Sequence, residues 1–173
     1  MRTAGLVLGL TLCSLGAICA VEANEAMSDT SETKSLTIDW HFDASLEDVW
    51  RAWTDPHVVA LWFGSDPNGE VLRASLDVHQ GGRFEVSFRD SDGTQHTASG
   101  VYEHVQPPSE LGFTWSWASE PGVQTFVRVQ IEPDDTGTMM RFEHSGLGYA
   151  SSHDYASGWR ATFAKMQAAI AQR

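Results

Sequence analysis

The sequence predicts an α+β fold: a curved antiparallel sheet of about seven strands, two short helices after the first strand, and a long C-terminal helix across the sheet. Three observations predict it. Apolar and polar residues alternate in most segments between residues 36 and 142. The stretch VWRAWTDPHVVALWFG, residues 49–64, has helical spacing on both sides of a proline. The end of the chain carries one apolar helical stripe.

The first strand and the two short helices are predicted within residues 36–63. In LTIDWHF, residues 36–42, every second residue is apolar, as in a strand with one buried face. Ser45 is suited to cap a helix whose apolar face comprises Leu46, Val49, Trp50 and Trp53. Pro56 ends that helix and opens a second one, whose apolar face comprises Val58, Val59, Trp62 and Phe63.

Six further strands follow, and the short turns between them make the sheet antiparallel. Alternation predicts their inward residues as Leu72, Ala74, Leu76 and Val78, then Phe84, Val86 and Phe88, then Leu111, Phe113, Trp115 and Trp117, then Val127, Val129 and Ile131, and finally Met140 and Phe142. The strand at residues 95–105 stays ambiguous, because Val101 and Tyr102 compete for its inward face.

A long helix is predicted at the end of the chain. Its apolar stripe comprises Tyr155, Trp159, Phe163, Met166 and Ile170. At about 30 Å it is the only element long enough to lie across the sheet. The two short helices then close one end of the sheet, with their aromatic faces packed under the long helix.

Several strings, together with this element order, resemble a known family. They are FDASLEDVWRAWTDPHVVALWFG, LDVHQGGRFEVSF, DGTQHTASGVYEHVQPPSELGFTWSW and GWRATFAKM. They are similar to homologues of the activator of the 90-kilodalton heat-shock chaperone's ATPase, within the START-like (SRPBCC) helix-grip superfamily. The resemblance covers roughly residues 34–172. One departure is Ala44-Ser45, where the family often has a proline after the alanine. The resemblance implies a cavity between sheet and long helix that holds an apolar ligand.

The chain divides into three predicted parts. Residues 1–20 are predicted to be a secretory signal peptide whose end lies as late as about residue 26, because Arg2 precedes an uncharged apolar run. Residues 21–34 are predicted to be a flexible linker, and residues 35–173 the START-like domain. This predicts export to the periplasm or the medium. The alternative is translation from Met27, which predicts a cytoplasmic protein and admits the chaperone as partner.

Charge and motifs narrow the function classes. The net charge of −12 disfavours nucleic acid and anionic membranes as partners, and no membrane insertion is expected after cleavage. Nucleophile-elbow, P-loop and zinc-protease motifs are absent from the sequence. The histidines are scattered, and the Glu103–His104 and Glu143–His144 neighbours point to opposite faces of a strand. No catalytic residue, metal or cofactor is therefore predicted, and His41 and His96 are placed at the surface.

The candidate ligand-binding residues are those expected to face the space between sheet and long helix: Phe84, Phe88, Trp115, Trp117, Phe142, His144, Trp159 and Phe163. Ordinary core packing is the alternative for each aromatic ring, and a half-solvated strand end is the alternative for His144. These residues predict a non-enzymatic protein that binds a small apolar or aromatic molecule. The alternatives are a cyclase- or aromatase-type enzyme and, with a Met27 start, a chaperone-regulating module. Fold alone does not choose among them.

Overall fold

The structure, a computed structural model, describes residues 34–148 and 154–172. The predicted signal peptide, and the predicted linker except Lys34, lie outside the described residues. Lys34 itself is the first residue of a strand.

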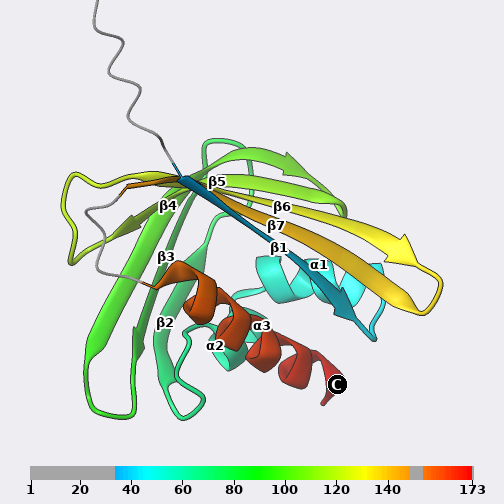
Figure 1. The fold of residues 1–173 in the computed structure, drawn as a ribbon, viewed down its shortest axis with the longest axis horizontal. Helices are drawn as coiled ribbons and strands as arrows, with labels where there is room; N and C mark the ends of the chain where they lie inside the picture. Colours follow the sequence, from blue (N-terminus) through cyan, green and yellow to red (C-terminus); the bar gives the residue numbers. More distant parts are fainter. Residues whose placement is uncertain (1–33, 149–153, 173) are drawn as a thin grey trace, which may run out of the picture. The chain divides into compact units, whose positions relative to one another are not determined.

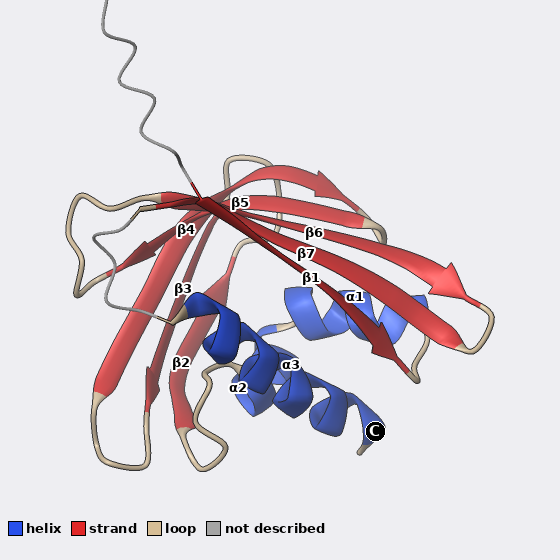
Figure 2. Cartoon of the chain, in the orientation of Figure 1, coloured by secondary structure: helices blue, strands red, loops and turns tan. Residues whose placement is uncertain are grey.

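The predicted fold class is confirmed. The elements are β1 (Lys34–Phe42), α1 (Leu46–Thr54), α2 (Pro56–Trp62), β2 (Glu70–Leu76), β3 (Arg83–Arg89), β4 (Gln95–Gln106), β5 (Glu110–Trp117), β6 (Thr125–Asp134), β7 (Gly137–Leu147) and α3 (Tyr155–Ala171). The sheet order is β1-β7-β6-β5-β4-β3-β2, and each paired neighbour is antiparallel. Figure 1 shows the sheet curving around the helices, and Figure 2 shows that the helices lie on its concave side.

One residue, Asp55, makes the kink between α1 and α2. Its main-chain N–H donates to the Arg51 carbonyl and ends α1, while its side chain accepts from the His57 N–H at 2.9 Å and caps α2. Pro56 occupies the first turn of α2, where a missing N–H is tolerated. At the other end of α1, the Ser45 side chain accepts from the Asp48 N–H, as predicted. Two short helices therefore share one turn without losing caps.

The helix pair buries its aromatic face as predicted. Trp53 and Trp62 meet edge to face at 5.2 Å, and the Trp62 indole N–H donates to the Ala52 carbonyl. The predicted stripe of α3 also faces inward, with Trp159, Phe163 and Met166 all buried. The concave side of the sheet is therefore filled mainly by aromatic and aliphatic side chains of these helices.

Two strands depart from simple alternation. Leu72 was predicted to point inward, but it is 46% exposed. The pairing of β2 with β3 shifts register between Val71 and Arg73, so the alternation of inward and outward side chains is interrupted at Leu72. In β4 the structure settles the open choice: Tyr102 is buried and Val101 is only half-buried. Gly100 lies on the face of Tyr102, where a side chain would collide with the Thr114 carbonyl of β5.

Candidate functional site

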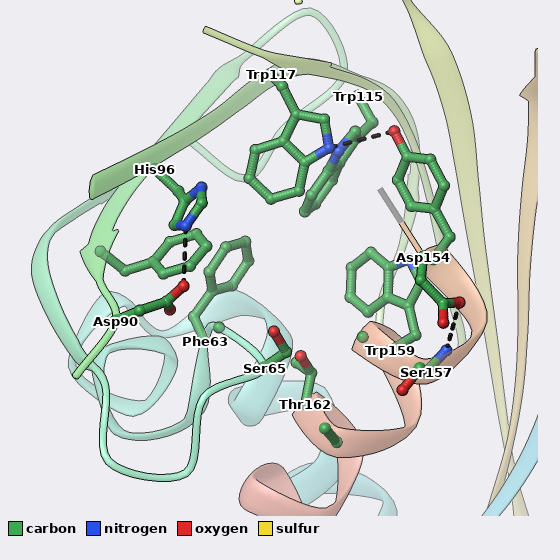
Figure 3. A pocket seen from close by; sticks show the side chains of 15 residues that line it. Phe63, Ser65, Asp90, His96, Trp115, Trp117, Asp154, Ser157, Trp159 and Thr162 are labelled. Carbon is green, nitrogen blue, oxygen red and sulfur yellow. Dashed lines mark hydrogen bonds and ion pairs between the residues drawn. The ribbon is translucent and has the colours of Figure 1, made fainter. Parts of the chain in front are cut away.

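An open cavity of about 440 Å³ lies between β3–β5, the end of α2 and the start of α3 (Figure 3). This volume falls within the range of small-molecule sites. The lining comprises Phe63, Gly64, Ser65, Phe88, Asp90, His96, Trp115, Trp117, Asp154, Tyr155, Ser157, Gly158, Trp159, Ala161 and Thr162. The cavity thus lies where the fold leaves the concave face of the sheet uncovered, beside the first turns of α3.

Aromatic rings form most of the wall. Trp115 and Trp117 of β5 are nearly perpendicular, with ring centroids 5.2 Å apart. Phe63 stacks on Trp115 at 5.8 Å, and Trp159 of α3 meets Trp115 edge to face at 5.0 Å. Because these rings brace one another, the wall is preformed and offers both faces and edges of π systems to a ligand.

A polar pair stands on the side of the cavity opposite Trp159 (Figure 3). The His96 Nε2 and Asp90 Oδ2 atoms are 2.9 Å apart, and the His96 ring stacks on Phe88 at 5.1 Å. Both side chains of the pair are about three-quarters buried, at 23% and 26% exposure. The other Asp90 oxygen, Oδ1, and the Trp115 ring nitrogen are buried without a hydrogen-bond partner among the described residues.

His144 lies behind this wall, and both of its ring nitrogens take part in a series of hydrogen bonds. Its Nδ1 accepts from the Trp159 indole N–H at 3.0 Å, and its Nε2 lies 2.7 Å from Thr125 Oγ1. The indole nitrogen only donates, so the His144 proton resides on Nε2 and is donated to Thr125. The Thr125 hydroxyl in turn donates to the Trp115 carbonyl. Burial lowers the pKa of His144 to about 3, so the ring is neutral at neutral pH.

Comparison with protein families gives one match over most of the chain. Residues 43–171 match the family described as "Activator of Hsp90 ATPase homolog 1-like protein". The chain belongs to this family. Its fold is that of the START-like helix-grip superfamily, as the resemblance implied. Comparison with curated proteins gives no match.

Several solved structures share the fold of this chain. A Rhodobacter sphaeroides protein is 18% identical with a TM-score of 0.71, over 82% of this chain and 100% of its own. An AHSA1-like protein from Aeromonas hydrophila is 23% identical with a TM-score of 0.67, over 80% of this chain and 93% of its own. A Nitrosomonas europaea protein is 19% identical with a TM-score of 0.68, over 80% and 94%. At these identities the likeness extends to the fold alone.

The structure distributes the predicted site residues over three places. The cavity is lined by four of them: Phe88, Trp115, Trp117 and Trp159. Phe84 lies beside a separate narrow gap of about 20 Å³ between the sheet and the short helices. Phe142, His144 and Phe163 are fully buried and lie outside the lining.

The structure excludes one alternative for a histidine and corrects one prediction. His144 is not a half-solvated strand end, because it is fully buried. His96 was placed at the surface, yet it lines the cavity. The sequence held a signal for the second, since His96 has the same parity in β4 as buried Ala98 and Tyr102. Its partner Asp90 had no such signal, because it belongs to a turn sequence, DSDGT.

Neither a metal-ion cluster nor a membrane-spanning helix occurs in the part of the chain that the structure describes. That part holds no cluster of three or more His, Cys, Asp or Glu side chains arranged for a metal ion. None of its helices combines the length and the apolar character that a membrane span needs.

Proposed function

We propose that this protein is a non-enzymatic protein that binds a small apolar or aromatic molecule in the cavity between the sheet and α3. The observation that carries the proposal is the open cavity of about 440 Å³ walled by Trp115, Trp117, Phe63 and Trp159. A flat ligand that packs against this aromatic wall buries apolar surface of both the ligand and the protein, which favours binding. Helix-grip proteins commonly bind ligands, which supports the same reading.

A cyclase- or aromatase-type enzyme is the second candidate, and the Asp90–His96 pair favours it. A histidine held by a carboxylate at a cavity wall can move a proton. His144 does not add to such a site, because both of its ring nitrogens are bonded to Thr125 and Trp159 behind the wall. We prefer the binding function to the enzymatic one, because the cavity offers a single acid–base pair and a large apolar surface.

A dye titration tests the binding function. Nile red, a neutral environment-sensitive dye, is expected to bind saturably with one site per chain. Trp117→Ala is expected to weaken this binding by about tenfold, or 1.4 kcal/mol, because a wall of the cavity is removed. Trp40→Ala is the matched control, since Trp40 is a half-buried tryptophan that packs on Phe163 away from the lining. Absence of saturable binding, or equal losses in both variants, would contradict the proposal.

Mass spectrometry separates binding from catalysis. Small molecules that co-purify with the protein are identified, added back to the apo protein, and followed over time. Unchanged mass and chromatographic retention support a binding protein. A new product that forms with the wild-type protein and not with Asp90→Asn would establish the enzyme instead.

We also propose that the protein is exported by its N-terminal leader. The support is the apolar run after Arg2, which lies outside the described residues. N-terminal sequencing of the native protein should find a start between about residues 17 and 26 in an extracytoplasmic fraction. An intact Met27 start in the cytosol would refute export and would favour a chaperone-regulating role.

A further inference from the structure

The charges around the cavity are of one sign. Among the described lining residues, the formally charged side chains at pH 7 are the carboxylates Asp90 and Asp154, with no lysine or arginine. Figure 3 shows them on opposite sides of the cavity. Asp154 is exposed and also caps α3 by accepting from the Ser157 N–H. Asp90 is the more buried carboxylate and therefore the one whose charge is least screened by water.

Asp90 is incompletely compensated. Its Oδ2 is bonded to His96, while its Oδ1 is buried and has no partner among the described residues. Burial lowers the pKa of Lys165 of α3, against the attraction of the Asp66 and Asp90 carboxylates, and the Lys165 ammonium donates to the Asp66 carbonyl at 2.8 Å rather than to Asp90. A buried carboxylate with one oxygen unpaired is unfavourable, so positive charge placed in the cavity beside it would be stabilised.

The aromatic wall favours the same kind of ligand. Trp115 and Trp117 are nearly perpendicular, Phe63 packs on Trp115, and Phe88 packs on both Trp117 and His96. Tryptophan faces attract cations through their quadrupole, more strongly where water is excluded. The unpartnered Trp115 nitrogen is a donor and gives no such preference.

We propose that the ligand is an organic ammonium ion, an aromatic amine in its protonated form. This inference rests on the proposed binding function and specifies its ligand class. The ammonium group lies in the cavity beside the Asp90–His96 pair, where the Asp90 charge attracts it without a bond to the buried Oδ1, and the aromatic part lies against Trp115 and Trp117. An anionic ligand of the same shape would meet two carboxylates with no cation in the lining, and a neutral one would leave Asp90 uncompensated.

Three probes of similar shape and different charge test the inference by calorimetry. They are 2-naphthylmethylammonium, 2-naphthalenemethanol and 2-naphthoate, titrated at neutral pH and physiological salt. The amine is expected to bind about tenfold more tightly than the alcohol, and the carboxylate more weakly than both. Asp90→Asn keeps the shape of the side chain and removes its charge, and is expected to abolish the preference while retaining binding of the alcohol. Asp135→Asn is the matched control, because it removes one charge from the exposed β6–β7 turn.

The outcomes separate this inference from the function on which it rests. If amine and alcohol bind equally well, the ammonium inference is wrong and the binding function stands. If the amine is preferred and Asp135→Asn reduces the preference as much as Asp90→Asn, the net charge of −12 is responsible and the assignment to Asp90 is wrong. If no probe binds, both proposals are wrong.

Discussion

Replacing His144 by phenylalanine removes a buried titratable group behind the cavity wall. Phenylalanine has nearly the volume of histidine, so packing in the fully buried position is largely retained. The change removes the acceptor of the Trp159 indole N–H and the donor to Thr125. Thr125 keeps its bond to the Trp115 carbonyl, whereas the Trp159 N–H is left buried without a partner.

These losses set the expected cost at neutral pH. An unsatisfied buried donor costs about 1–3 kcal/mol, and one lost hydrogen bond about 1 kcal/mol more. The free energy of unfolding of His144→Phe at pH 8 is therefore expected to be about 2–4 kcal/mol below that of the wild type.

The cost should shrink in acid. In the folded protein the pKa of His144 is about 3, below its ordinary value of 6.5, so the unfolded chain binds the proton first. The stability associated with the neutral ring is complete above pH 6.5 and is lost as the pH falls toward 3. At pH 5 the wild type should have lost about 2 kcal/mol through this group, and the variant nothing.

Urea denaturation at pH 8 and pH 5 measures both quantities for the two proteins. The difference between wild type and His144→Phe should fall by about 2 kcal/mol between these pH values. His57→Phe serves as control for the exchange of histidine for phenylalanine, because His57 is exposed on α2 and lies outside the cavity lining. A difference between wild type and His144→Phe that does not change with pH would refute a neutral, buried His144.

Three further predictions concern single contacts. Trp159→Ala should lower the free energy of unfolding by about 3 kcal/mol in urea, since the ring is 95% buried yet faces the cavity on one side. Gly158→Ala should raise the free energy of unfolding by about 0.5–1 kcal/mol, because alanine favours the helix and a Cβ there meets no atom within 4 Å. Gly100→Ala should lower the free energy of unfolding by about 1–3 kcal/mol, because its Cβ would collide with β5. The hydrogen bonds from Ser91 lower the pKa of Asp66 to about 2. The stability that they provide should therefore be lost as the pH falls below 3.8 in the wild type, and this loss should be absent in Asp66→Asn. Unfolding followed by tryptophan fluorescence in acid titrations measures both.

The order of elements could be predicted because local chemistry agrees with the fold. Ser45 and Pro56 mark helix starts by properties that act within one turn, and the predicted caps are present. For the apolar stripe of α3 and for most strands, the spacing of apolar residues was enough to predict both the type of element and its buried face. Leu72 could not be predicted, because the bulge in β2 depends on pairing with β3 rather than on the residues of β2 alone.

The residues of the candidate site could be predicted only in part from the sequence. Parity predicts which face of a strand a residue occupies, and it correctly turned Trp115 and Trp117 inward. It does not predict which inward residues are covered by a helix and which remain at an opening. Phe142 and Trp117 are both inward, yet only Trp117 lies where α3 leaves the sheet uncovered. Asp90 reaches the cavity from a turn, where no periodic signal exists.

His144 shows how a residue outside the cavity can still shape it. It connects α3 to β6 by bonding Trp159 and Thr125, and Thr125 bonds the main chain of Trp115. The Trp159 ring and the main chain of Trp115 are thereby held from behind by hydrogen bonds as well as by packing. A wall fixed in this way needs little ordering when a ligand binds, which favours affinity for rigid flat molecules. Burial keeps the His144 ring neutral at pH values well below neutrality, so the hydrogen bonds behind the wall persist there.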